Sequence, residues 1–281
     1  MAKIIISNTQ LKRVLNISKR KQTVSGKQQA QVESCVLMCD GSKARITSLT
    51  RDLTGLTEVT AECEGLGRIP IPDIDRVLGI LSLHSENLTI SWDSATNKLL
   101  FKSAGKQTTL DASFEAKAFS HSQETINDFA LRSETLANKI DAKNGVYTLG
   151  DGTEQHSFCS FEVNVSDLYD ACRCDTINGQ RLNRYTFKVD LEETCDIEIT
   201  VGDPTLGQTT SIIAVENPAT QPIHPDCAFT WDFDGGLDEL FKGFTGKAKL
   251  NFFDFREHSQ GIRFSVSFGS GEWAWAAGAL N

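Results

Sequence analysis

The most regular feature of the sequence is a short helix-like apolar pattern that follows a strand-like run and recurs four times. In the clearest copy, Ile74, Val77, Leu78 and Leu81 have the i, i+3, i+4, i+7 spacing of an amphipathic helix, directly after the apolar run 69–71. The four helix-like patterns begin at Leu11, Ile74, Leu168 and Leu237. Each predicts a helix of about three turns, which is too short to be stable alone and must therefore lie on a sheet.

Residues typical of helix starts precede these patterns. Ser7 or Asn8 could cap the first helix, Pro72 suits the first turn of the second, and Ser166 could cap the third. The fourth pattern follows the pair Gly235-Gly236.

Several strand-like runs follow each predicted helix. After the first, the runs 32–38 and 44–49 are joined by Asp40-Gly41, a strong hairpin signal. The later runs, many of which alternate apolar and polar residues as half-buried strands do, are 88–92, 99–101, 108–110, 185–189, 197–201, 211–215, 250–253, 262–268 and 273–275. The repeating unit is thus strand, helix and several strands. This order predicts an α+β fold, although a chance fourfold match in a β-rich protein is the alternative.

The spacing of the repeats divides the chain in two. Residues 11 and 74 are 63 positions apart and residues 168 and 237 are 69 apart, whereas 74 and 168 are 94 apart. The excess falls in the polar segment 113–156. We therefore expect an N-terminal domain over 1–112, a connector with extra sequence over 113–156, and a C-terminal domain over 157–281.

Charge is distributed unevenly along the chain. The 281 residues hold 28 Lys and Arg against 37 Asp and Glu, a net charge of −9. The first 32 residues contain no acid and seven bases, namely Lys3, Lys12, Arg13, Lys19, Arg20, Lys21 and Lys27. A basic N-terminal segment in an otherwise acidic chain predicts a local surface that binds an anion. A cleaved organelle-targeting peptide is the alternative.

Other signals exclude several classes of protein. No run approaches the ~18 apolar residues of a membrane helix, and the first residues do not form a signal peptide. Eight cysteines without an export signal indicate reduced thiols and a cytoplasmic location. The cysteines lack paired C-x2-C spacing, the five histidines are scattered, and no phosphate-binding loop or acid–base pair is present. The sequence predicts no catalytic residue, cofactor or metal site, and no membrane partner.

With these elements in place, the chain resembles the sliding-clamp family, the ring-shaped processivity factors of DNA polymerases. The resemblance rests on the stretch 67–78, which continues into 88–90 and 98–103 like the second half of a clamp domain. It covers most of residues 1–112, and residues 157–281 mainly through the order of elements. Two domains per chain fit the trimeric archaeal, eukaryotic and phage clamps, because the bacterial dimer has three domains per chain.

The resemblance implies a fold, a function and partners. The fold would have two similar domains, each of two strand-helix-multistrand units, with helices on the inner face of curved antiparallel sheets. The chain would be a non-enzymatic homotrimer that encircles double-stranded DNA without reading its sequence and tethers a DNA polymerase. A clamp-loader ATPase would open the ring inside the cell, or inside a virus-infected host cell.

Helices that line such a ring should present cations to phosphates. The first helix meets this expectation best, because no acid lies near its bases. The expected DNA-facing residues are Lys12, Arg13, Lys19, Arg20, Lys21, Arg76, Arg173, Arg181, Arg184, Lys242 and Lys247. Beyond the first helix these bases stand among acids, so a solvated helix face is the alternative for each.

Clamp clients insert a short apolar peptide near the connector and the C-terminal tail. By resemblance, the pocket would comprise Met38, Ile46, Phe114, Phe119, Trp273 and Trp275. The alternative for the tryptophans is that they alternate about Ala274 and pack as ordinary strand residues.

Two other functions fit parts of the sequence. A β-rich structural or virion assembly protein could use the basic N-terminus as an arm on nucleic acid. A hydrolase with a β-sandwich body would need a catalytic site, and the sequence does not offer one.

Overall fold

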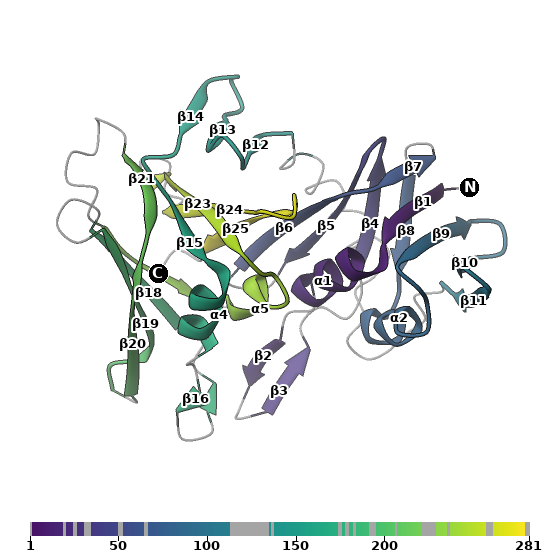
Figure 1. The fold of residues 1–281 in the computed structure, drawn as a ribbon, viewed down its shortest axis with the longest axis horizontal. Coiled ribbons are helices and arrows are strands. Elements are labelled where there is room, and N and C mark those ends of the chain that lie inside the picture. The colour runs from purple at the N-terminus through teal and green to yellow at the C-terminus, as the bar shows by residue number, and fades with distance from the viewer. Residues whose placement is uncertain are drawn as a thin grey trace. The chain divides into compact units, whose positions relative to one another are not determined.

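The chain forms two compact units in the computed structural model (Figure 1). The structure describes residues 2–18, 21–24, 27–30, 35–49, 53–64, 67–112, 135, 138–173, 176–177, 180–181, 184–190, 195–205, 207–220, 229–234, 237–256 and 261–278. The N-terminal unit comprises Met1–Arg20, Ala30–Leu49 and Leu56–Asn138, and the C-terminal unit comprises Lys21–Gln29, Thr50–Gly55 and Lys139–Asn281.

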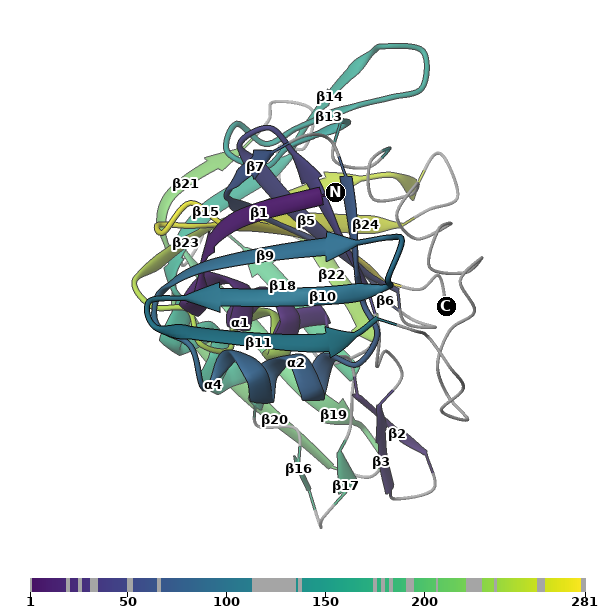
Figure 2. The same cartoon turned by 90° about the vertical axis from the view of Figure 1, so that its right-hand side faces the viewer.

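One antiparallel sheet of the N-terminal unit has the strand order β11-β10-β9-β1-β7. Its strands are β1 (Ala2–Ser7), β7 (Glu62–Glu64), β9 (Asn87–Asp93), β10 (Lys98–Ser103) and β11 (Lys106–Asp111). Figure 2 shows β9, β10 and β11 as an up-and-down meander. Alternate residues of these strands are buried, which explains the apolar–polar alternation of the sequence.

The second sheet of the N-terminal unit has the order β6-β5-β4-β8. Its strands are β4 (Cys35–Asp40), β5 (Lys43–Leu49), β6 (Leu53–Thr60) and β8 (Gly67–Ile71). The central strand β4 is buried on both faces at all positions except Asp40.

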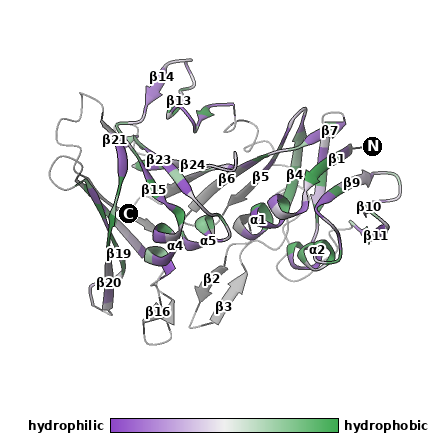
Figure 3. Ribbon diagram, viewed as in Figure 1, coloured by the Kyte–Doolittle hydropathy of each residue, from purple (hydrophilic) through white to green (hydrophobic). Residues whose placement is uncertain are grey.

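Two helices cover the N-terminal unit's core, as expected from the apolar spacing. In α1 (Asn8–Ser18) the buried residues Leu11, Val14 and Leu15 lie on one face, and α2 (Ile74–Leu81) buries three residues in the same way. The N–H of Gln10 donates to Ser7 Oγ at 3.1 Å, so Ser7 caps α1. Asp73 caps α2 by accepting from the N–H of Arg76. Green hydrophobic residues run along both helices and β4 in Figure 3.

The two strand-helix-multistrand halves of the N-terminal unit exchange strands. The strand before α1, β1, pairs with β9, which follows α2, so that Ile4 lies opposite Ile90. The strand before α2, β8, pairs with β4, which follows α1, so that Leu37 lies opposite Ile69. Each sheet therefore needs strands from both halves, and this exchange explains why the repeat occurs in pairs.

The C-terminal unit repeats this exchange. The strand before helix α4 (Val165–Arg173), β15 (Cys159–Asn164), pairs with β23 (Lys247–Asp254). The strand after α4, β18 (Arg184–Asp190), pairs with β22 (Phe229–Asp234). The fourfold repeat predicted from the sequence is thus present as two strand-exchanged pairs.

The remaining strands complete two sheets in the C-terminal unit, with the orders β20-β19-β18-β22 and β21-β15-β23-β24-β25. They are β19 (Asp196–Asp203), β20 (Gly207–Ala214), β21 (Glu216–Thr220), β24 (Ile262–Phe268) and β25 (Trp273–Gly278). Two hairpins are short: β2 (Lys21–Val24) with β3 (Lys27–Ala30), and β16 (Thr176–Ile177) with β17 (Gln180–Arg181).

An aromatic cluster fills the C-terminal unit's core. Phe252 contacts Phe161, Phe187 and Phe264, with ring centroids 5.7, 6.1 and 5.6 Å apart. All four rings are fully buried and come from four different strands, so they hold the two sheets together.

Three helix predictions need correction. Pro72 lies before the cap Asp73 and therefore outside the first turn of α2, which begins at Ile74. The helix α5 (Asp238–Phe241) has only four residues rather than three turns, because the chain is already extended at Lys242 and Gly243 has φ 81°. The helix α4 begins at Val165, so Ser166 lies inside its first turn instead of capping it.

The extra sequence before residue 157 forms a small sheet, β12 (Ile140–Asp141), β13 (Val146–Thr148) and β14 (Glu154–His156), which we call the insert sheet. It packs on the face of β23-β24-β25 that points away from the aromatic core. The backbone carbonyl of Ala142 accepts from Asn251 Nδ2 and Ser267 Oγ, both at 2.8 Å.

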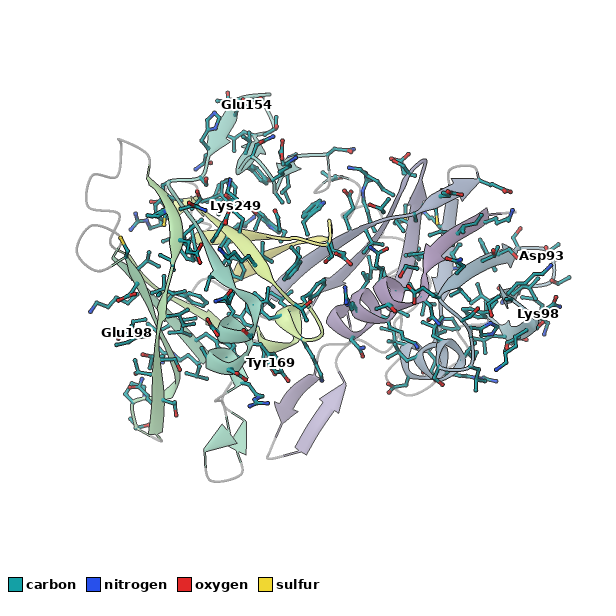
Figure 4. The ribbon with its side chains drawn as sticks, in the orientation of Figure 1. Asp93, Lys98, Glu154, Tyr169, Glu198 and Lys249 are labelled. Carbon is teal, nitrogen blue, oxygen red and sulfur yellow. The ribbon has the colours of Figure 1, made fainter. Side chains whose placement is uncertain are left out.

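Further contacts hold the insert sheet in place. Lys249 Nζ donates to the Lys143 carbonyl at 3.2 Å, and Figure 4 labels Lys249 on β23 and Glu154 on β14. A Cβ at Gly145, which has φ 68°, would stand 2.6 Å from Ser157 Oγ, so only glycine fits there. No helix in the described parts of the chain is long and apolar enough to cross a membrane.

Candidate nucleic-acid and peptide-binding surfaces

The two helices of the N-terminal unit carry cations on their solvent side. Lys12 and Arg13 are half-buried on α1, between its core-facing residues, and Arg76 is exposed on α2. The helices α1 and α2 are in contact, so these three bases lie on neighbouring elements of the unit.

An acidic residue lies at one end of this surface. Glu86 accepts from the hydroxyls of Ser7 and Thr9, and these hydrogen bonds, with a smaller contribution from Lys12, lower the pKa of its carboxyl group. Glu86 therefore stays ionised and fixes the start of α1.

In the C-terminal unit, two of the expected DNA-facing bases are paired with acids. Arg173 Nη2 lies 3.3 Å from Asp170 Oδ1, and its guanidinium lies 5.4 Å from the ring centroid of Tyr169, which Figure 4 labels on α4. Lys247 bonds Glu216, and this hydrogen bond raises the pKa of the ammonium group.

The remaining expected DNA-facing residues lie on different elements and differ in exposure. Lys242 is exposed at the end of α5 and Arg184 is half-buried on β18. Lys21 lies in β2 and Arg181 in β17, with side chains outside the description, and Lys19 and Arg20 lie outside the described residues. The structure thus places Lys12, Arg13 and Arg76 on two helices that contact each other.

A second candidate surface lies on the sheet β6-β5-β4-β8, on the face opposite the helices. A pocket of about 470 Å³ opens there. The residues that line it are Met38, Cys39, Asp40, Arg45, Gly67, Arg68 and Asn138. All belong to the N-terminal unit.

An ion-pair network forms one side of this pocket. Arg45 Nε lies 2.5 Å from Glu58 Oε2, and Lys43 Nζ lies 2.9 Å from Glu58 Oε1. Arg45 Nη1 also lies 3.6 Å from Asp40 Oδ2. Arg45 and Glu58 are both buried, so their mutual pairing is required to offset the cost of removing their charges from water.

Arg68 lies on the other side of the pocket and differs from Arg45 in its exposure and pairing. Its side chain is exposed, and it makes no hydrogen bond or ion pair within the part of the chain that the structure describes. Sequence reasoning missed both arginines and Glu58. A signal was present for Arg68, because it lies one residue before the buried Ile69 and must point to the opposite face.

The structure separates the residues expected to form the client-peptide pocket. Met38 lines the pocket, but Ile46 lies on the opposite face of the sheet, fully buried in the core. The register explains this correction: Met38 pairs with Arg45, and the next residue of β5 points the other way.

The expected aromatic anchor of the tail also needs correction. Trp275 is fully buried beneath the insert sheet, where Tyr147 stacks on it at 5.4 Å, so it packs as an ordinary strand residue. Trp273 is half-buried on the same strand. Phe114 and Phe119 lie outside the described residues.

Two sheet edges complete the candidate surfaces. The strand β11 is the last of its sheet in the N-terminal unit, and β20 is the last of its sheet in the C-terminal unit. Ile212 on β20 is 72% exposed, the highest value among the exposed large hydrophobic residues described. An exposed apolar side chain on an open edge favours pairing with another strand.

Comparison with known proteins adds a finding at the level of the fold. No protein-family model matches the chain, and no curated protein matches it in sequence. Among solved structures, PCNA from Thermococcus kodakaraensis matches with a TM-score of 0.60 at 9% identity, over 100% of both chains. The fold is that of a DNA sliding clamp.

Two bacterial clamps share this fold. The beta subunit of DNA polymerase III from Thermotoga maritima matches with a TM-score of 0.61 at 10% identity. The DNA polymerase sliding clamp from Bacillus subtilis matches with a TM-score of 0.58 at 12% identity. The chain spans only 66% and 64% of their lengths. The α+β clamp fold predicted from the sequence is confirmed over the whole chain.

Proposed function

We propose that the protein is a sliding clamp that encircles double-stranded DNA and tethers a DNA polymerase. The observation that carries the proposal is the end-to-end match to the clamp fold of PCNA, with two strand-exchanged units and a pair of helices in each. The retention of polymerase would be topological and would require no catalytic residue. The protein would act inside the cell, together with an ATPase that opens the ring.

The proposed DNA contact is the helix surface. Lys12, Arg13 and Arg76 carry positive charge there, while the whole chain has a net charge of −9. A few cations at least partly exposed to solvent in an acidic protein suit a contact that holds phosphates without reading bases or binding tightly. Such a contact lets a ring slide.

The proposed ring is a homotrimer closed by strand pairing between copies. The edge β11 of one copy would pair with the edge β20 of the next, which places Ile212 in the interface. Pairing of two different edges is head-to-tail, and such contacts form a ring when the rotation closes.

The decisive experiment tests topology. Purified protein is incubated with linear duplex DNA whose ends are free, and the ends are then blocked with streptavidin. A ring that has threaded onto the DNA stays bound in 0.5 M salt and is released when a restriction enzyme cuts off one block. DNA that was blocked before incubation should retain no protein.

Equal retention on DNA blocked before and after incubation would overturn the proposal. That result indicates ordinary surface binding, as expected of a nucleic-acid-contacting assembly protein. A monomeric mass in light scattering at micromolar concentration, instead of three times the 30.9 kDa chain, would also contradict it.

A further inference from the structure

Two thiols from the two sheets of the N-terminal unit are in contact. Cys39 belongs to β4 of one sheet, and Cys63 belongs to β7 of the other. Cys39 is 3% exposed in the hydrophobic core, and Cys63 is half-buried and packs against the same core. The thiols form a hydrogen bond with each other, and neither is in a disulfide.

The hairpin that joins β4 and β5 fixes the position of Cys63. The backbone N–H of Cys63 donates to the carbonyl of Gly41 at 2.8 Å, and its Sγ donates to the carbonyl of Lys43 at 3.3 Å. Both carbonyls lie within a few residues of Cys39 along the chain. The same short segment therefore holds both cysteines, and their contact does not depend on a distant part of the fold.

The strands beside Cys39 leave its thiol room to turn. The residues paired with Cys39 are Ala44 on β5 and Gly67 on β8, the two smallest residue types. Side chains of paired residues are the nearest neighbours on a sheet face. A disulfide needs a dihedral angle of about 90° around its sulfur–sulfur bond, and small neighbours permit the side-chain rotation that reaches it.

The two thiols differ in acidity and in access to solvent. Burial raises the pKa of both, and the interaction with Cys63 raises the pKa of Cys39 further, whereas the hydrogen bond with Cys39 lowers the pKa of Cys63. Cys63 is also the more exposed of the two. The thiolate is the reactive form of cysteine, so Cys63 should react first with a soluble oxidant, next to the thiol of Cys39.

We propose that Cys39 and Cys63 form an oxidation site, at which hydrogen peroxide or another hydroperoxide converts the two thiols into a disulfide between β4 and β7. The Cys63 sulfur attacks the O–O bond, gains one oxygen as a sulfenic acid, and releases the other oxygen as water or an alcohol. The Cys39 sulfur then attacks the Cys63 sulfur and displaces the hydroxyl group as water. The thiols lose two electrons in total, and these electrons reduce the peroxide.

The disulfide would close a covalent loop over residues 39–63, which include β5 and β6, and would anchor β7, the last strand of its sheet. A closed loop restricts the unfolded chain and so stabilises the folded state. This site is independent of the proposed function, because it involves neither DNA nor a second copy of the chain.

The test is peptide mapping of the full-length protein. Reduced protein is treated with hydrogen peroxide, the remaining thiols are blocked with iodoacetamide, and a non-reducing digest is analysed by mass spectrometry. We expect a linked peptide that contains Cys39 and Cys63, absent before treatment and lost again with dithiothreitol. In Cys39→Ala, Cys63 should remain a sulfenic acid that dimedone captures. The matched control Cys35→Ala removes another buried thiol of β4 and should still form the link.

Urea unfolding measures the effect of the link on stability. Peroxide should raise the urea midpoint of the wild-type and of Cys35→Ala, and dithiothreitol should reverse the shift, whereas Cys63→Ser should show no shift. Complete alkylation of Cys63 under conditions that already oxidise the exposed Cys195 would overturn the proposal. A link that forms only in urea, or that joins Cys63 to a second chain, would also overturn it. The mapping of the wild-type needs no substitution, so it decides the question even if a variant does not fold.

Discussion

At the scale of single residues, Asn8 joins the two helices of the N-terminal unit. Its Nδ2 donates to the carbonyls of Leu81 at 2.9 Å and His84 at 2.8 Å, at the end of α2, and the side chain is 3% exposed. Asn8→Ala leaves two carbonyls without this donor, and we expect a loss of about 2 kcal/mol in the free energy of unfolding. Urea denaturation measures it.

Asn8→Asp should cost more than the alanine change, because a carboxylate would face two carbonyl oxygens. The exposed Asn87 provides a control, and Asn87→Asp should change stability by less than about 0.5 kcal/mol. Equal stability of Asn8→Ala and Asn8→Asp would show that Nδ2 does not make these bonds.

His84 makes the N-terminal unit sensitive to acid. Its ring nitrogens bond Ser103 Oγ at 2.9 Å and Thr108 Oγ1 at 3.0 Å, and burial, with a smaller effect of Lys106, lowers its pKa below 6.5. The folded state thus binds fewer protons than the unfolded state, so stability is full above pH 6.5 and falls as the pH decreases towards the folded-state pKa.

The measurement compares the free energy of unfolding of the wild-type and His84→Gln between pH 5 and 8. The difference between them should shrink as the pH falls below 6.5, because the glutamine side chain does not titrate. Parallel profiles would assign the acid sensitivity to other groups.

Residue-level prediction from the sequence succeeded where it depended on periodicity. The buried helix residues Leu11, Ile74 and Leu168 follow directly from the apolar spacing. The grouping of Met38 with Ile46 was wrong, because strand register decides the face, and a shift of one position reverses it. The hairpin signal Asp40-Gly41 could have fixed that register, because a short turn sets the pairing of the two strands that it joins.

At the scale of elements, the insert sheet protects an aromatic face of the C-terminal unit. Tyr147 contacts Trp275 at 5.4 Å and Phe255 at 5.0 Å, and all three are buried. Tyr147→Ala should lower the free energy of unfolding by about 3 kcal/mol, because it leaves a cavity between the two layers. Thermal and urea unfolding measure the loss.

Tyr169→Ala is the matched control, because Tyr169 is only half-buried on α4, and we expect a loss of less than about 1 kcal/mol. Equal effects of the two changes would indicate that the insert sheet adds no stability to the C-terminal unit.

The sequence predicted the order of elements better than their packing. Each strand run before a helix was found, but its partner belongs to the other half of the unit. The partner can follow, as β9 does for β1, or precede, as β4 does for β8, and local patterns do not encode such pairing. The segment 113–156 was expected to be a connector with extra sequence. The described part of that extra sequence packs on β23-β24-β25, through bonds such as Asn251 to Ala142 that span 109 residues, and no local pattern predicts such packing.

At the scale of the whole molecule, the open edge β20 should control assembly. Ile212 is 72% exposed, so Ile212→Asp removes little packing within the chain, but it places a charge in the proposed interface. We expect the trimer to dissociate to monomers. The thermal unfolding of each monomer should stay unchanged. Light scattering after size exclusion measures the mass.

Ile5→Asp is the control, because Ile5 is 36% exposed on β1, which is an inner strand of its sheet rather than an edge. It should leave the trimer intact. A trimer that survives Ile212→Asp but not Ile5→Asp would place the interface elsewhere.

The balance of charge over the molecule leads to a prediction about DNA. Lys12 and Arg76 lie on the contacting helices α1 and α2. Reversing both to Glu changes the net charge from −9 to −13 and turns the proposed contact from attractive to repulsive. Threading onto linear DNA should then fall about tenfold or more at 50 mM salt, and the gap to the wild-type should narrow as salt rises, because screening weakens both attraction and repulsion. Reversing Lys102 and Lys143, both exposed, changes the net charge equally but should leave threading nearly unchanged and the trimer intact. Equal losses from the two pairs would mean that total charge controls the interaction, and the helices would then have no special part in holding DNA.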